Sequence, residues 1–135
     1  MRWDEALEAA LQRLSDDGAL ATALTTAQGA HNPITRAGEL ATPALPGLTY
    51  SVTGNWLTDT EEVAFTEWRL RSTTLAGLIA IERRMRAALD RRYPEDVGGS
   101  ELLMEYVNGQ DAEETPGAGA YGRVVWYRIT VRRDS

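Results

Sequence analysis

Three carboxylates lie close together around one predicted turn, at Asp59, Glu61 and Glu62. Carboxylate oxygens are ligands that Mg²⁺ and Ca²⁺ prefer, so these residues are the candidates for a cation-dependent hydrolase. Glu61 and Glu62, however, are neighbours at the start of a predicted strand, where successive side chains point to opposite faces. This geometry favours a solvated turn over a metal site.

The other side chains offer little further chemistry. His31 is the only histidine, and the 135 residues include no cysteine and no lysine. A lone histidine lacks the partners that a zinc site requires, and without cysteine there is no disulfide framework or thiolate site. Without lysine there is no P-loop lysine and no Schiff base. We therefore predict that the protein is not an enzyme and that it binds no metal or cofactor.

Arginine supplies all 14 basic groups, and two of them alternate with large apolar residues in the run Trp68, Arg69, Leu70, Arg71. Alternating aromatic and basic residues occur in grooves that bind single-stranded nucleic acid. The formal net charge of −6, however, repels a phosphate backbone over the molecule as a whole. A strand with one polar face explains the pattern more simply. We expect no specific nucleic-acid binding.

The elements that carry these residues indicate an α+β fold in a single domain, residues 1–135. The order α-β-β-α-β-β predicts an antiparallel sheet of about four strands with two main helices packed on one face. Residues 25–47 are expected to form an irregular loop with one short edge strand at 34–36, and residues 108–120 a mobile acidic, glycine-rich loop. Apolar spacing predicts helices at 3–14, 19–24 and 73–90, and strands at 48–53, 61–72, 101–107 and 121–133.

The strand predicted at 61–72 carries apolar residues in two phases. Val63 and Phe65 share one face, whereas Trp68 and Leu70 fall on the other. Either a bulge near Thr66–Glu67 changes the register, or both faces are partly covered. A small domain has enough helices to cover only one face of its sheet. If both faces of this strand are buried, another subunit is expected to cover the second face. The candidate subunit-interface residues are Trp56, Leu57, Val63, Phe65, Trp68, Arg69, Leu70 and Arg71, and the candidate partner-contact residues of the acidic loop are Asp111, Glu113 and Glu114.

Five segments follow one another along most of the chain: EALEAALQRL, LPGLTYSV after a proline-rich loop, VAFTEWRLRS, LAGLIAIERRMRAALD and YGRVVWYRITVR. In type and order they resemble the tail terminator, or tail-completion, proteins of long non-contractile-tailed bacteriophages and related gene-transfer particles. The tryptophan-containing strand that runs into a threonine-capped helix ending in ALD carries most of the resemblance.

The resemblance implies a structural virion protein that forms a ring, commonly a hexamer, at the end of the tail tube. Such a ring stops tail growth and joins the tail to the head. The implied partners are further copies of itself, the tail tube protein and the head–tail connector protein, with DNA passing through without specific binding and with no membrane. The implied location is the virion tail or neck, after assembly in the host cytoplasm. Two alternatives stay open: a head-completion or neck connector protein, and a small non-viral α+β ligand-binding module.

Overall fold

A computed structural model describes residues 4–24, 34–37, 46–89, 95–97, 100–112 and 121–133. Within these ranges the chain forms three helices and one six-stranded sheet, an α+β fold as the sequence predicts. In chain order the elements are α1 (Glu5–Asp16), α2 (Gly18–Ala23), β1 (Ile34–Arg36), β2 (Gly47–Leu57), β3 (Glu61–Ser72), α3 (Leu75–Leu89), β4 (Glu95–Val97), β5 (Ser100–Ala112) and β6 (Tyr121–Arg133).

The sheet has the strand order β1-β2-β3-β6-β5-β4. Its four long strands, β2, β3, β6 and β5, pair antiparallel and correspond to the four strands predicted from the sequence. Two three-residue strands extend the edges: β4 pairs antiparallel with β5, and β1 pairs parallel with β2. The prediction of about four antiparallel strands was therefore short by these two edge strands, although β1 matches the edge strand expected at 34–36.

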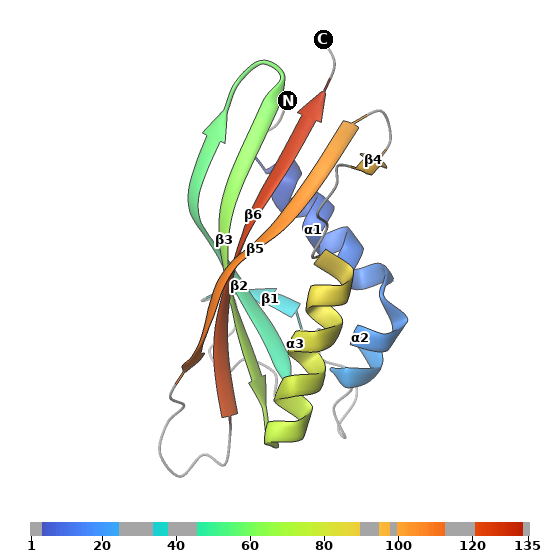
Figure 1. The fold of residues 1–135 in the computed structure, drawn as a ribbon, viewed down its shortest axis with the longest axis vertical. Coiled ribbons are helices and arrows are strands. Elements are labelled where there is room, and N and C mark those ends of the chain that lie inside the picture. Colours follow the sequence, from blue (N-terminus) through green and yellow to red (C-terminus); the bar gives the residue numbers. More distant parts are fainter. Residues whose placement is uncertain are drawn as a thin grey trace.

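All three helices lie on one side of the sheet, which leaves the other side without a helical cover in the described part of the chain (Figure 1). We call the side under the helices the inner face and the opposite side the outer face. α1 and α3 each present an apolar stripe to the inner face, as amphipathic helices do. Thr74 begins α3, because its hydroxyl accepts a hydrogen bond from the amide of Gly77 at 3.0 Å.

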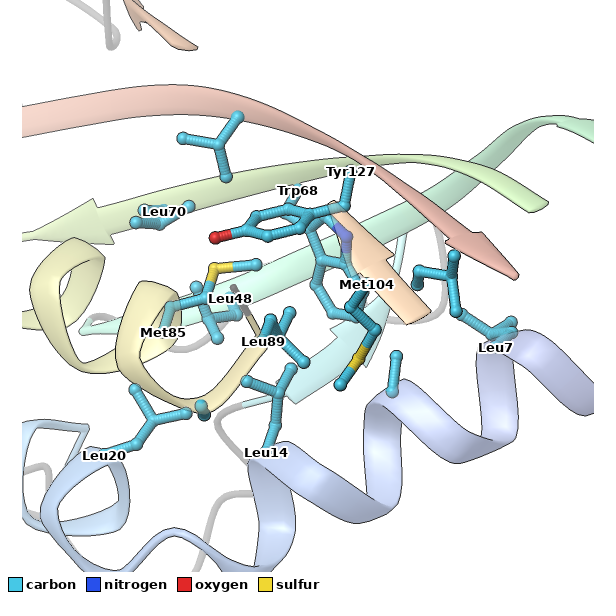
Figure 2. Packing of buried hydrophobic residues seen from close by; sticks show 14 of the residues in the cluster. Leu7, Leu14, Leu20, Leu48, Trp68, Leu70, Met85, Leu89, Met104 and Tyr127 are labelled. Carbon is cyan, nitrogen blue, oxygen red and sulfur yellow. The ribbon is translucent and has the colours of Figure 1, made fainter. Parts of the chain in front are cut away.

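Figure 2 shows the core between the sheet and the helices, with Trp68 and Tyr127 from the strands and Met85, Leu89 and Leu14 from the helices. Trp68 has no exposed surface, so its indole N–H needs a partner inside the protein. That N–H donates to Thr66 Oγ1 at 2.8 Å, and the same hydroxyl donates to the carbonyl of Tyr127 at 3.2 Å. A three-residue polar chain therefore lies within an otherwise apolar core.

β3 alternates between the two faces along its whole length and pairs with β6 without a register shift. The bulge expected near Thr66–Glu67 is therefore not in β3. The register shifts fall in the neighbouring strands, between Val52 and Gly54 in β2 and between Tyr106 and Asn108 in β5. β3 therefore carries apolar residues on both of its faces. This agrees with the second alternative from the sequence, in which both faces of the strand are partly covered.

β5 continues well past the end predicted for it. The first five residues of the loop expected at 108–120 are strand instead, because residues 108–112 pair with β6 as far as Ala112 opposite Gly122. Glu113 and Glu114 lie outside the described residues, as does most of the loop expected at 25–47. Asn108 and Gly109, which resemble a turn in sequence, are here part of a bulged strand.

Candidate subunit interface on the outer face of the sheet

The outer face carries an apolar surface at the level of the turn that joins β2 to β3. Trp56 lies opposite Val63, Val63 lies opposite Thr130, and Thr130 lies opposite Leu103, so one row crosses all four long strands. Phe65 lies two residues beyond Val63 on the same face. Trp56 and Phe65 expose 61% and 43% of their surface. We call Trp56, Phe65 and Leu103 the outer apolar surface; Val63 lies between them on the same face but is itself buried.

Ion pairs lie beside this surface. Arg132 Nη2 is 2.9 Å from Glu61 Oε2, and Arg132 Nη1 is 3.9 Å from Glu101 Oε1. Arg128 Nη2 is 2.5 Å from Glu105 Oε1. The charged residues on the outer face of the long strands are Glu61, Glu67, Glu101 and Glu105 with Arg69, Arg71, Arg128 and Arg132. The two signs balance, whereas binding to a phosphate backbone needs an excess of positive charge.

The three carboxylates at the turn do not converge. Glu61 lies on the outer face with Arg132, Asp59 is exposed, and Glu62 is fully buried on the inner face. The described residues contain no group of three histidine, cysteine, aspartate or glutamate side chains that is arranged to hold a metal ion. A cation-dependent hydrolase built on these three residues is therefore incompatible with the geometry.

Glu62 instead connects β3 to the start of α1, a role that the sequence did not reveal. Its Oε2 accepts a hydrogen bond from the amide of Ala6 at 3.2 Å, and its Oε1 accepts one from Asn55 Nδ2 at 3.2 Å. The first amides of a helix have no intrahelical partner and carry partial positive charge. Asp4, which precedes the helix, makes no side-chain cap. The carboxylate from β3 therefore supplies an acceptor to this helix end.

The structure divides the predicted interface residues between the two faces. Trp68 and Leu70 have no exposed surface and pack in the core beneath the helices, so they cannot contact another subunit. This corrects their place among the candidate interface residues. Val63 lies on the outer face but exposes only 7% of its surface. The other candidates on that face, Trp56, Phe65, Arg69 and Arg71, keep part of their surface exposed. Leu57 lies at the hairpin end opposite Glu62, with 42% of its surface exposed. Asp111 is exposed on β5 and lies 3.1 Å from Arg123 Nη1.

The arginine-rich half of α3 is joined to the sheet. Arg123 Nε on β6 lies 2.7 Å from Glu82 Oε2 on α3 in an ion pair, and the interaction of Arg123 with the Glu82 carboxylate is the main cause that raises the pKa of Arg123. Arg86 lies over the ring of Tyr106, with 4.1 Å between its guanidinium carbon and the ring centroid. These contacts give Arg86 and Arg123 structural roles between α3 and the sheet.

Sequence reasoning missed further exposed apolar residues. Leu75 and Ile79 lie one turn apart on α3 and expose 55% and 47%, and Tyr121 at the start of β6 exposes 48%. Val107, at the bulge in β5, exposes 60%. Helical spacing predicts Leu75 on the buried stripe of α3, and this prediction is wrong because the residue lies exposed at the start of the helix.

A hollow between α1 and the β4 end of the sheet is lined mainly by charged side chains, among them Glu5, Glu8, Asp16, Asp17 and Asp96. Small-molecule pockets are lined mainly by apolar and aromatic groups. The hollow therefore gives little support to a ligand-binding module. None of the described helices is long and apolar enough to cross a membrane.

Comparisons with known proteins bear on the fold. No protein-family model and no curated protein sequence matches this chain. Among solved structures, it matches a chain from a structure described as "Virion of native gene transfer agent (GTA) particle", with a TM-score of 0.65 and 16% sequence identity. The match covers 96% of this chain and 97% of the other. The two chains thus share one fold over nearly their whole lengths.

Proposed function

We propose that this protein is a structural component of a phage-type virion, where it forms a ring at the end of the tail tube. The ring ends tube growth and joins the tail to the head. The observation that carries the proposal is the fold shared end to end with a chain of a gene transfer agent virion.

The surface chemistry supports an assembly role. Trp56 and Phe65 expose large apolar side chains beside ion pairs on one face, and exposed apolar groups with a polar rim are typical of protein–protein contacts. Arg69 and Arg71 lie on the same face. We propose that this outer face contacts neighbouring proteins of the tail, with the tail tube protein and the head–tail connector protein as partners beside further copies of the chain.

The charge of the chain fits a channel that DNA crosses. A net charge of −6 does not attract the phosphate backbone, so DNA slides through without being held. We propose six copies in the ring, assembly in the host cytoplasm, and no catalytic residues. We propose that the exposed carboxylate of Asp111, which lies near the end of β5, contacts a partner together with Glu113 and Glu114.

Deletion of the gene from its parent particle tests this proposal. Loss of a tail terminator leaves tails of uncontrolled length that do not join heads, and electron microscopy measures both properties. Complementation with the wild-type gene restores uniform joined tails. Tails of normal length beside unjoined heads point instead to the neck connector alternative, and a population of normal joined particles contradicts both roles.

A further inference from the structure

Large exposed apolar side chains lie at both ends of the molecule. Figure 1 shows the β2–β3 hairpin at one end of the long axis and the start of α3 towards the other. Trp56 and Leu57 are exposed at the hairpin end, and Leu75 and Ile79 are exposed on the first turns of α3. Exposed apolar patches on a soluble protein commonly mark contacts with other proteins. Each end of the molecule is therefore a candidate contact surface.

The hairpin exposes apolar side chains on both faces of the sheet. Trp56 lies opposite Val63 on the outer face, whereas Leu57 lies opposite Glu62 on the inner face. We call Trp56, Leu57 and the turn residue Asp59 the hairpin tip. A flat partner surface covers only one face of a two-stranded tip, whereas a groove covers both faces. The hairpin tip therefore fits a groove in its partner.

The hairpin tip carries negative charge. Residues 51–68 contain aspartate and glutamate but no arginine. Glu62 is buried, and Glu61 is paired with Arg132 from β6. Asp59 is exposed at the turn itself. A complementary groove would therefore combine apolar side chains with positive charge.

The opposite end of the chain provides such a groove. It lies between α3 and β6 with a volume of about 640 Å³, and we call it the α3 groove; its lining residues are Ile79, Glu82, Arg83, Arg86, Ala87 and Arg123. Glu82 is engaged with Arg123 inside it, and Arg83 is exposed. Leu75 lies one turn before Ile79 on the same side of α3. The α3 groove is therefore basic, with exposed apolar side chains beside it.

A single copy cannot bring its own hairpin tip and α3 groove together. Glu61, next to the hairpin tip, lies opposite Arg132, whereas the groove residue Arg123 lies further back along β6. At a rise of about 3.3 Å per residue, the stretch of β6 from Arg123 to Arg132 spans roughly 30 Å. Only a second molecule can cover either surface, and a second copy of the chain offers the complement of each.

We propose that the hairpin tip of one copy docks in the α3 groove of the next copy, where Leu57 packs against Ile79 and Asp59 pairs with Arg83. Charge complementarity and the apolar side chains on both surfaces carry this choice of partner. The contact is heterologous, because two different surfaces meet, and its repetition closes a ring when the rotation between copies allows it. The inference rests on the proposed ring and names the surfaces that meet in it.

Site-specific cross-linking tests the contact because the chain has no cysteine of its own. The variants are Leu57→Cys, Ile79→Cys and the double variant Leu57→Cys/Ile79→Cys, with Leu57→Cys/Ser15→Cys as the matched control. Ser15 is exposed on α1 and belongs to neither surface. Each variant replaces the deleted gene, and purified particles are treated with a short bis-maleimide. All three positions are exposed, so thermal unfolding of each variant is expected to match the wild type.

The double variant with cysteine at 57 and 79 is expected to give a ladder of covalent oligomers up to a closed ring. Particles with a mixture of the two single variants are expected to give dimers and nothing larger, because each copy then has one cysteine. Each single variant alone, and the control, are expected to stay monomeric on a denaturing gel.

Three results would overturn the proposal. Dimers from Leu57→Cys alone or from Ile79→Cys alone would show that two like surfaces meet. Monomers only from the 57/79 variant, or a ladder from the control, would exclude the contact between hairpin tip and α3 groove. A link from position 57 to a different protein of the particle, identified by mass spectrometry, would assign the hairpin tip to that protein instead.

Charge reversal tests the ion pair within the contact. In the 57/79 cysteine background, Asp59→Arg and Arg83→Asp are each expected to lower the yield of the ladder several-fold. The two reversals together are expected to restore it, because opposite charges meet again. Asp16→Arg, at an exposed position on α1, is the control and is expected to leave the yield unchanged. A yield that stays low with both reversals would overturn the pairing of Asp59 with Arg83.

The proposed function fails by a different readout, namely unchanged tails after gene deletion. In that case the same cross-linking on concentrated purified protein decides the contact: a ladder from the 57/79 variant supports it and monomers overturn it.

Discussion

The carboxylate of Glu62 on β3 accepts a hydrogen bond from the amide of Ala6 in the first turn of α1, at 3.2 Å, although 56 residues separate the two in the chain. Glu62 has no exposed surface. A buried carboxylate is costly unless it is hydrogen-bonded, and the positive end of a helix is a favourable environment for it. This contact fixes where α1 sits on the sheet, close to the hairpin that carries Trp56 and Leu57.

Replacement of Glu62 by alanine should lower the free energy of unfolding by about 1–3 kcal/mol, because the buried Ala6 amide loses this acceptor. Glu62→Gln keeps one acceptor oxygen but loses the charge, so a smaller loss is expected. Urea denaturation measures both. Glu61→Ala is the matched control, since its ion pair with Arg132 lies at the surface and contributes less than about 1 kcal/mol. Equal losses from Glu62→Ala and Glu61→Ala would contradict this account.

Thr66→Val should destabilise the protein by about 1–3 kcal/mol even though valine is more apolar and similar in size. The Thr66 hydroxyl accepts from Trp68 Nε1, and its removal leaves a buried N–H without that partner. In a Trp68→Phe background the same substitution should cost clearly less, because no indole N–H is left to satisfy. A double-mutant cycle in urea measures this coupling. Additive losses would show that the hydrogen bond does not stabilise the core.

Gly77→Ala should lower stability by about 1 kcal/mol, although alanine is the better helix former. A Cβ at position 77 would clash with Ser72 Oγ and lie 2.9 Å from Thr74 Oγ1, the hydroxyl that caps α3. In a Ser72→Ala background the loss should shrink or become a gain. Thermal unfolding of the four variants measures it. The same loss in both backgrounds would rule out the close approach of Ser72 as the reason for glycine.

Arg123→Ala should cost about 1–2 kcal/mol, because Arg123 pairs with both Glu82 and Asp111 and joins α3 to the β5–β6 hairpin. The pKa of Arg123 is raised in the folded state, so its contribution is present at low pH and is lost only as pH rises through that raised pKa. The loss from Arg123→Ala should therefore be constant between about pH 6 and pH 9. Arg128→Ala, which removes the exposed pair with Glu105, serves as the control. A larger loss from the control would contradict the assignment.

The long elements could be predicted from the sequence because their signals are local. Strand β3 matches the predicted 61–72 in full, and β6 matches 121–133, since alternation and bounding turns lie within each segment. A bulge in β3 was one of two interpretations of its pattern, because apolar residues on both faces of a strand look like a change of phase; the register shifts lie in β2 and β5 instead. Whether Trp68 faces the helices depends on the partners of the strand, which a local pattern does not contain.

Contacts between distant segments explain the other differences. The burial of Glu62 follows from α1 docking over β3, and its sequence neighbours Asp59 and Glu61 indicated only an exposed acidic turn. The extension of β5 to Ala112 follows from pairing with β6 across Asn108 and Gly109, which have strong turn propensity on their own. The edge strand β4 has only three residues, too few for a periodic signal.

Electron cryo-microscopy of the head–tail junction of the parent particle tests the central claim most directly. We predict a closed ring of six copies at the head-proximal end of the tail tube. A junction whose density is filled by other proteins, with this chain absent from the purified particle by mass spectrometry, would contradict the claim.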